Sequence, residues 1–321
     1  MTRSRKPVIP PARTTHTVAR PPRTILELDR FAEADVDRWN EVSRDLNELN
    51  DILHFGLEPE RRRRRPEILG ALLSEAPTSI DISGWVRIVT YQYSSSPLSC
   101  TGSLTYVGGR FNAGMDLEPN TIEPWPALYV AENFETAYRE KFQLAKGEII
   151  NGLTPEELAL NAGGSHATLL LRGKLSNVFD MTSYEHLNGV AAELAKIKMP
   201  ERAKQLKRKL NIPDSDLVMT RTGKQLHESA VSHNWRILPV QYGLPAPSQV
   251  LAEMVRAAGF EAILYSSTKA GRPCLAIFPD KLVDGSYVEL IDAAPEGVID
   301  TRLDIDTADR LSGWDDVIRR R

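Results

Sequence analysis

The spacing of hydrophobic and polar positions divides the chain into a helical first part and a longer part that mixes strands and helices. Between residues 24 and 54, hydrophobic residues recur at about helical spacing with charged residues between them. That pattern is typical of amphipathic helices. Pro66 then begins a short helix that runs to Leu73. We therefore predict a helical N-terminal region over 24–78, after a basic, disordered leader at 1–23.

Short runs of β-branched and aromatic residues begin near Gly84, and turn-forming residues bound them, as is common for strands. An Asn133 N-cap predicts a helix over 134–144, and Pro247 begins another that Gly259 ends. Residues 183–245 are expected to be mostly helical, and 294–321 to be a polar tail with a short helix near 315–319. The expected strands are 85–89, 104–107, 127–131, 167–174, 262–265, 274–278 and 287–291.

Composition excludes several classes of protein. Of 321 residues, 41% are hydrophobic, enough for a sizeable core, and the net charge of −3 creates no field that would attract nucleic acid. The two cysteines are too few for a disulfide framework, and neither they nor the six histidines show metal-ligand spacing. No apolar run approaches the roughly 20 residues of a membrane span. We expect a cytoplasmic protein that contacts no membrane and needs no metal.

The run from Arg61 to Arg65 has two interpretations. It can be an electrostatic patch for nucleic acid, phosphate or an acidic partner. It can also be a solvated linker between helices, which the negative net charge and the absence of interleaved aromatic residues favour.

One stretch combines residues suited to chemistry. Arg110 follows two glycines, which let the backbone approach a ligand closely, and its guanidinium can bind a pyrophosphate through paired hydrogen bonds. Tyr129 lies in an apolar strand, where its ring can line a pocket. Glu140 lies on the predicted helix, and its carboxylate can stabilise a developing ribosyl cation. Each residue also has a purely structural alternative: a surface turn, aromatic core packing and an exposed helix glutamate.

With two further segments, these residues resemble the RES domain, a family named for an arginine, a glutamate and a serine. The similar segments are Trp85-Val86-Arg87, Gly108 to Asn112, Tyr129 to Glu140, and Gly259 to Phe278. The resemblance spans 79–293, interrupted by a long helical insert near 183–245. It identifies Ser267 as the family serine, although Ser266 is an alternative. Two of these residues also have purely structural alternatives: Ser267 can be an ordinary loop serine, and Arg87 can form a structural salt bridge. This sequence has Phe111 where tryptophan is commoner and Lys269 where an arginine often stands.

The resemblance implies an α+β fold of the ADP-ribosyltransferase type, with a small, mostly antiparallel sheet, flanking helices and an N-terminal helical appendage. It also implies a toxin of a bacterial toxin–antitoxin system that cleaves the nicotinamide–ribose bond of NAD, by hydrolysis or phosphorolysis. NAD is then a substrate, held by Arg87, Arg110, Tyr129 and Ser267, while Arg110, Glu140 and Ser267 serve catalysis.

Two other functions stay open. One is protein ADP-ribosylation with NAD as donor, and the other is a non-catalytic binding module with a degenerate site. The family resemblance further implies a helix-turn-helix antitoxin as partner, so that nucleic acid is met only indirectly.

Overall fold

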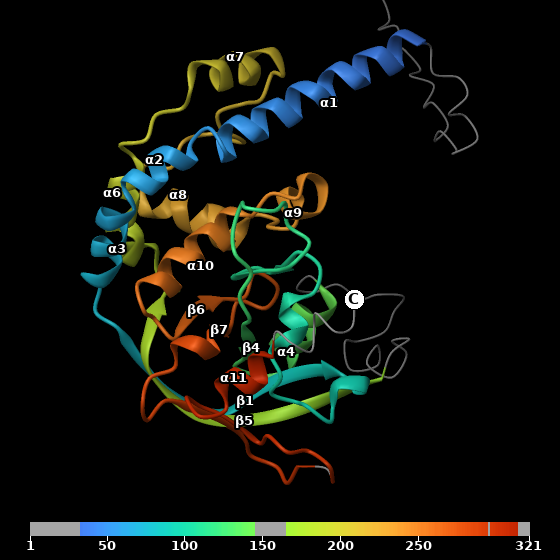
Figure 1. Cartoon of the computed structure of the whole chain (residues 1–321), viewed down its shortest axis with the longest axis vertical. Coiled ribbons are helices and arrows are strands. Elements are labelled where there is room, and N and C mark those ends of the chain that lie inside the picture. The colour runs from blue at the N-terminus through green and yellow to red at the C-terminus, as the bar shows by residue number, and fades with distance from the viewer. Residues whose placement is uncertain (1–32, 145–164, 295, 314–321) are drawn as a thin grey trace, which may run out of the picture. The chain divides into compact units, whose positions relative to one another are not determined.

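The computed structural model describes residues 33–144, 165–294 and 296–313 (Figure 1). The predicted leader, the start of the predicted N-terminal helical region and the helix predicted near 315–319 lie outside the described residues. The chain divides into two units, Met1–Asp45 and Leu46–Arg321. All the predicted site residues belong to the second unit.

Three helices occupy the described part of the predicted N-terminal helical region: α1 (Glu33–His54), α2 (Glu58–Arg63) and α3 (Arg65–Leu73). Proline stands in the first turn of α3, where its missing N–H leaves no hydrogen bond unmade. Ile68 and Leu72 of α3 are fully buried in the main hydrophobic core. The last part of this region is therefore packed into the second unit.

The five consecutive arginines lie on α2, on α3 and at the junction between them, and each contacts a carboxylate. The run is therefore mostly helical, and its charge is partly balanced by neighbouring acidic side chains, while Arg62 and Arg63 are exposed to solvent. The weakest contact, made by Arg64, measures 3.9 Å. The pairs are Arg61–Glu58, Arg62–Glu58, Arg63–Glu60, Arg64–Glu193 and Arg65–Glu253.

In the described residues, seven strands form one sheet in the order β1-β4-β7-β6-β5-β8-β9, and β1 also pairs with β5. That extra pairing closes β1, β4, β7, β6 and β5 into a ring. Only the β5–β6 pair is parallel among these described pairings. The strands are β1 (Thr78–Thr90), β4 (Leu128–Ala131), β5 (His166–Asp180), β6 (Ala262–Ser266), β7 (Pro273–Ile277), β8 (Tyr287–Leu290) and β9 (Arg302–Leu303).

The mixed α+β fold is confirmed, but the expected small sheet is instead partly a barrel. The physical reason is the length of β1 and β5, which have 13 and 15 residues. Both are longer than the local pattern predicts, and they run side by side in Figure 1. Twisted strands of this length can bend round and close the sheet.

Both faces of the sheet are buried. Along β7, Cys274 and Ala276 belong to one hydrophobic cluster, while Leu275 and Ile277 belong to the other. Successive strand residues point to opposite faces, so this apolar run serves two cores. The second cluster draws residues from all five strands of the ring, as the interior of a closed sheet requires.

Several helices lie in the segment between β5 and β6. In Figure 1, α8 and α10 lie over β6 and β7. Helix α10 ends before Gly259, whose φ of +93° suits the left-handed residue after a helix. The elements are η4 (Tyr184–Leu187), α6 (Asn188–Leu194), α7 (Glu201–Lys209), α8 (Gly223–His227), the π-helix η5 (Glu228–Ser232), α9 (Ile237–Tyr242) and α10 (Pro247–Ala257).

Two expectations about secondary structure are wrong. The strand expected at 104–107 is replaced by a 3-10 helix, η3 (Thr101–Leu104), and by Tyr106 in the left-handed region with φ of 54°. The segment expected to be a polar tail instead contains β9 and α11 (Ala308–Ser312), which bury Leu303 and Leu311. No helix among the described residues has the length and apolar character needed to cross a membrane.

Candidate active site

The turn that carries Arg110 is a short hairpin. β2 (Gly108–Gly109) pairs antiparallel with β3 (Asn112–Ala113), so Arg110 and Phe111 form the connection. Gly108 has φ of +86°, a region where other residues are strained. A Cβ on Gly109 would lie 2.5 Å from the Tyr129 hydroxyl oxygen. These glycines therefore serve the turn and its close contact with a tyrosine.

The Tyr129 hydroxyl, which projects from β4, holds this turn in place. It donates a hydrogen bond to Asn112 Oδ1 at 2.9 Å and accepts one from the Phe111 N–H at 2.9 Å. Burial raises the pKa of Tyr129, so the hydroxyl keeps its proton and can donate. Tyr129 thus supports the turn that carries Arg110, while its predicted contact with the nicotinamide or its ribose stays a prediction.

A second support for the turn comes from α10. The amide nitrogen of the fully buried Gln249 lies 2.9–3.0 Å from three carbonyl oxygens of the hairpin segment. Those carbonyls belong to Val107, Gly109 and Asn112. The hairpin is therefore fixed from two sides, by a strand tyrosine and by a helix glutamine.

The Arg110 side chain reaches the C-terminal end of the π-helix η5. Its Nη1 lies 2.6 Å from the Val231 carbonyl oxygen and 3.3 Å from those of Ala230 and His233. Carbonyls at a helix end carry partial negative charge and attract a cation. The Nε and Nη2 atoms make no hydrogen bond with any described residue. The half-buried guanidinium is thus anchored through one nitrogen, and two others can meet a ligand.

Arg87 of β1 makes its hydrogen bonds to backbone carbonyls. Its Nε and Nη2 donate to Pro97 O at 3.0 Å and Ser99 O at 2.8 Å, and Nη1 lies 3.4 Å from Tyr129 O. No carboxylate in the described part of the chain pairs with it, so the salt-bridge interpretation does not hold there. Burial lowers the pKa of Arg87. Its predicted contact with NAD phosphates stays a prediction.

Glu140 and Ser267 meet directly. Glu140 lies on α4 (Phe134–Phe142), which begins at Asn133, where the side chain accepts the Thr136 N–H at 2.9 Å as the predicted N-cap. Ser267 follows β6, is buried, and donates its hydroxyl to Glu140 Oε1 at 2.6 Å. The second carboxylate oxygen of Glu140 makes no hydrogen bond or ion pair with any described residue.

The surroundings of Ser267 fix the direction of its hydroxyl proton. Its oxygen accepts the N–H groups of Lys269 and Ala270, both at 3.1 Å. Because the oxygen already accepts two donors, its own proton is directed to Glu140. Ser266 makes no such contact and pairs instead with Pro273 in the sheet. The structure therefore brings Ser267, and not Ser266, to the glutamate.

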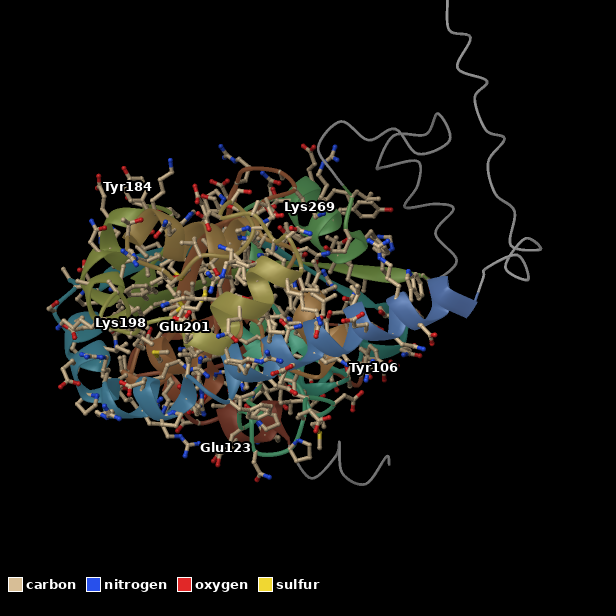
Figure 2. The ribbon with its side chains drawn as sticks, turned by 90° about the horizontal axis from the view of Figure 1, so that it is seen from above. Tyr106, Glu123, Tyr184, Lys198, Glu201 and Lys269 are labelled. Carbon is tan, nitrogen blue, oxygen red and sulfur yellow. The ribbon has the colours of Figure 1, made fainter. Side chains whose placement is uncertain are left out.

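An ion pair fixes the turn that contains Ser267. Arg272 Nε lies 2.6 Å from Glu132 Oε2, and the Ser267 N–H donates to Arg272 O at 2.8 Å. Figure 2 labels Lys269, which lies on this turn. Glu132 thus pairs with the residue whose carbonyl accepts the Ser267 N–H.

Arg236 is a site residue that the sequence did not indicate. It precedes α9, and its Nη1 donates to Gln143 Oε1 at 2.9 Å, three residues after Glu140. Its guanidinium carbon lies 4.6 Å from the centre of the Trp235 ring. Burial and the charge of Arg110 lower the pKa of Arg236, while the charge of Glu140 acts in the opposite direction. Two arginines and one carboxylate therefore share one electrostatic environment.

Aromatic and thiol groups complete these surroundings. The Phe111 and Tyr265 rings lie 4.7 Å apart between centres. Burial, with a smaller contribution from Glu140, raises the pKa values of Tyr265 and Cys274. Both groups therefore stay neutral at physiological pH. In the parts of the chain that the structure describes, no group of three or more His, Cys, Asp or Glu side chains could hold a metal ion.

Part of this chain matches a known protein family. Residues 186–299 match the family model of the RES domain. This match confirms the predicted resemblance to the RES family. The RES match includes Arg236 and Ser267 as well as most of the segment expected to be an insert, whereas Arg110 and Glu140 precede it.

A search of curated proteins finds no match. Among solved structures, the chain is similar to one in a crystal structure of the M. tuberculosis MbcT–MbcA toxin–antitoxin complex. The two chains are 13% identical, with a TM-score of 0.38 over 77% of this chain and 97% of that one.

Three residues of the site lay outside the predicted set. Arg236, Gln249 and Arg272 act through contacts between segments distant in the sequence. A conspicuous local signal existed only for Gln249, which occupies the N3 position of α10, where its side chain accepts the Ala246 N–H at 2.9 Å. Nothing in the sequence around Arg236 indicates that it lies near Glu140.

Proposed function

We propose that this protein cleaves the bond between nicotinamide and ribose in NAD and acts as a toxin of the RES type in the cytoplasm. The observation that supports this most strongly is the 2.6 Å hydrogen bond from Ser267 to Glu140. It orients one carboxylate oxygen and leaves the other with no partner among the described residues. Such a carboxylate can face a developing positive charge.

The reaction breaks the bond between the nicotinamide nitrogen and the ribose C1 carbon. Nicotinamide leaves with the bonding electron pair and becomes neutral, while positive charge builds on the ribose, as in other glycosidic cleavages. Glu140 stabilises that charge electrostatically and can accept a hydrogen bond from a ribose hydroxyl. Ser267 acts as a positioning residue, because its only proton is engaged by Glu140.

The acceptor completes the reaction. Water yields ADP-ribose and releases a proton, whereas inorganic phosphate yields ADP-ribose carrying a phosphate on the ribose. A protein side chain as acceptor would give ADP-ribosylation, the main alternative. We favour water or phosphate because the RES resemblance implies NAD depletion.

The binding-module alternative is less well supported. It rests on the helical N-terminal region and the run Arg61 to Arg65, and every arginine of that run already contacts a carboxylate. A degenerate site would also not be expected to keep the Ser267–Glu140 contact. We further propose a helix-turn-helix antitoxin as the neutralising partner, an expectation that the RES resemblance supports.

Controlled expression in bacteria tests the toxin function. Expression of the wild type should lower cellular NAD and stop growth, while Glu140→Gln, which keeps the shape of the side chain and the bond from Ser267, should do neither. Glu123→Gln is the matched control, because Glu123 is exposed and lies on the opposite side of the view from Lys269 in Figure 2. Equal NAD levels in cells that express wild type and Glu140→Gln would contradict the proposal.

A further inference from the structure

The segment from η5 to Arg236 links two parts of the site. At one end, the carbonyls of Ala230, Val231 and His233 hold Arg110 Nη1. At the other end, Arg236 Nη1 donates to Gln143, the residue that ends the helix carrying Glu140. Residues 230–236 therefore extend from the Arg110 turn to the end of α4 and form one side of the site.

Arg236 differs from most half-buried arginines of the protein. In the described residues, the others contact a carboxylate, with the exceptions of Arg87 and Arg110. Arg87 donates from all three nitrogens to backbone carbonyls. Arg110 and Arg236 each engage only Nη1, so each keeps Nε and Nη2 without a partner among the described residues.

Two half-buried cations that lie in one electrostatic environment repel each other, and removing them from water is costly. The nearby Glu140 supplies only one negative charge and forms no ion pair with either arginine within the described residues. An anion with two charges and several acceptor oxygens would balance the pair. Arginine forks bind such oxygens through two parallel hydrogen bonds.

We propose that Arg236, together with Arg110, binds the pyrophosphate of NAD. This inference rests on the proposed function and adds to it a second arginine, supplied by the η5–α9 segment, that recognises the dinucleotide. The buried Trp235 ring, 4.6 Å from the guanidinium carbon of Arg236, restrains the side chain before the ligand arrives. A guanidinium restrained in this way loses less conformational entropy on binding.

Calorimetric binding tests this role in the full chain carrying Glu140→Gln, a change expected to slow turnover strongly. The probes are NAD and ADP-ribose, which contain a pyrophosphate, and nicotinamide riboside, which contains none. Adding Arg236→Gln should weaken NAD and ADP-ribose about 10- to 100-fold, as expected for hydrogen bonds between charged groups. Nicotinamide riboside should bind equally well with or without the change.

Two controls separate binding from support of the fold. Gln143→Gly removes the contact to Arg236 and suits the left-handed backbone at that position, whose φ is 60°. It should weaken NAD binding much less than Arg236→Gln does. Arg221→Gln changes an exposed arginine and should leave all three affinities unchanged.

Several outcomes would overturn the proposal. They are unchanged binding of NAD and ADP-ribose in Arg236→Gln, equal loss of all three probes, or no binding of NAD or ADP-ribose by the parent protein. The proposed function can fail separately. If ADP-ribose binding depends on Arg236 but the wild type releases no nicotinamide, the pyrophosphate site is supported and the proposed cleavage of NAD is contradicted. If the wild type cleaves NAD with a KM that Arg236→Gln leaves unchanged, the reaction stands and this role of Arg236 does not.

Discussion

Replacing Ser267 with alanine removes three hydrogen bonds through the loss of one oxygen atom. The side chain is only 3% exposed; it donates to Glu140 at 2.6 Å and accepts two N–H groups at 3.1 Å. A hydrogen bond to a charged group contributes about 1.5–3 kcal/mol and a neutral one about 0.5–1.5 kcal/mol. Because Lys269 and Ala270 are half-buried, water can replace part of what they lose. We therefore expect the free energy of unfolding to fall by about 2–3 kcal/mol.

The same change should slow the reaction. Without the serine, Glu140 can rotate away from the ribose, and a displacement of about 1 Å can cost roughly 100-fold in rate. We expect kcat for nicotinamide release to fall about 10- to 100-fold, with a smaller change in KM, because the serine positions the carboxylate that faces the transition state.

Ser266→Ala is the matched control. The Ser266 side chain is half-buried and makes no hydrogen bond within the described residues, so this change should alter stability by less than about 0.5 kcal/mol. Urea unfolding measures stability, and chromatography of released nicotinamide measures the rate. The reasoning fails if Ser267→Ala unfolds at the wild-type urea concentration and keeps the wild-type rate, or if Ser266→Ala has the larger effect.

Three further substitutions test other parts of the structure. Gly109→Ala places a Cβ 2.5 Å from the tyrosine hydroxyl that holds the hairpin and should lower the free energy of unfolding by about 1–3 kcal/mol in urea unfolding. Gly102→Ala, with open space around it, should not lower it. Equal stability of the two variants would refute the packing argument. Arg65→Gln breaks a partly exposed contact between α3 and α10 and should lower the free energy of unfolding by about 0.5–1 kcal/mol. Arg62→Gln, at a more exposed arginine, should lower it less. A larger loss in Arg62→Gln would contradict the dependence on burial. Burial lowers the pKa of His54 from 6.5 to about 4, so the folded state resists protonation and stability declines as pH falls from 6.5 to 4. His54→Gln should lose less stability over that range in urea titrations, and identical pH profiles would exclude this role.

Local patterns in the sequence predicted most helices and strands, but not the closure of the sheet by the pairing of β1 with β5. The strand at β7 and the capped helix α4 lie close to where the sequence placed them, because their signals are carried by adjacent residues. The pairing of β1 with β5 depends on contacts between distant segments and on strand lengths that local composition underestimates. The chain after residue 294 looks polar because Leu303 and Leu311 are isolated among charged residues, although both are buried.

The candidate site shows the same division. Arg110, Glu140 and Ser267 lie in segments recognisable by their order along the chain, and the structure adds the direct contact between the last two. The role of Tyr129 in holding the hairpin could not be predicted, because it depends on the distance from its hydroxyl to Asn112 across two strands. Arg236 was missed for the same reason, since only the folded chain places it near Arg110 and Glu140.

Release of nicotinamide from NAD by the purified protein tests the central claim most directly. Wild type and Glu140→Gln would be compared in parallel, with and without inorganic phosphate. The account predicts release by the wild type at a rate about 100- to 1,000-fold above that of Glu140→Gln, as expected when a charge that stabilises the transition state is removed. Equal rates for the two proteins, or no release by the wild type with water or phosphate, would contradict the claim that Glu140 drives cleavage of NAD.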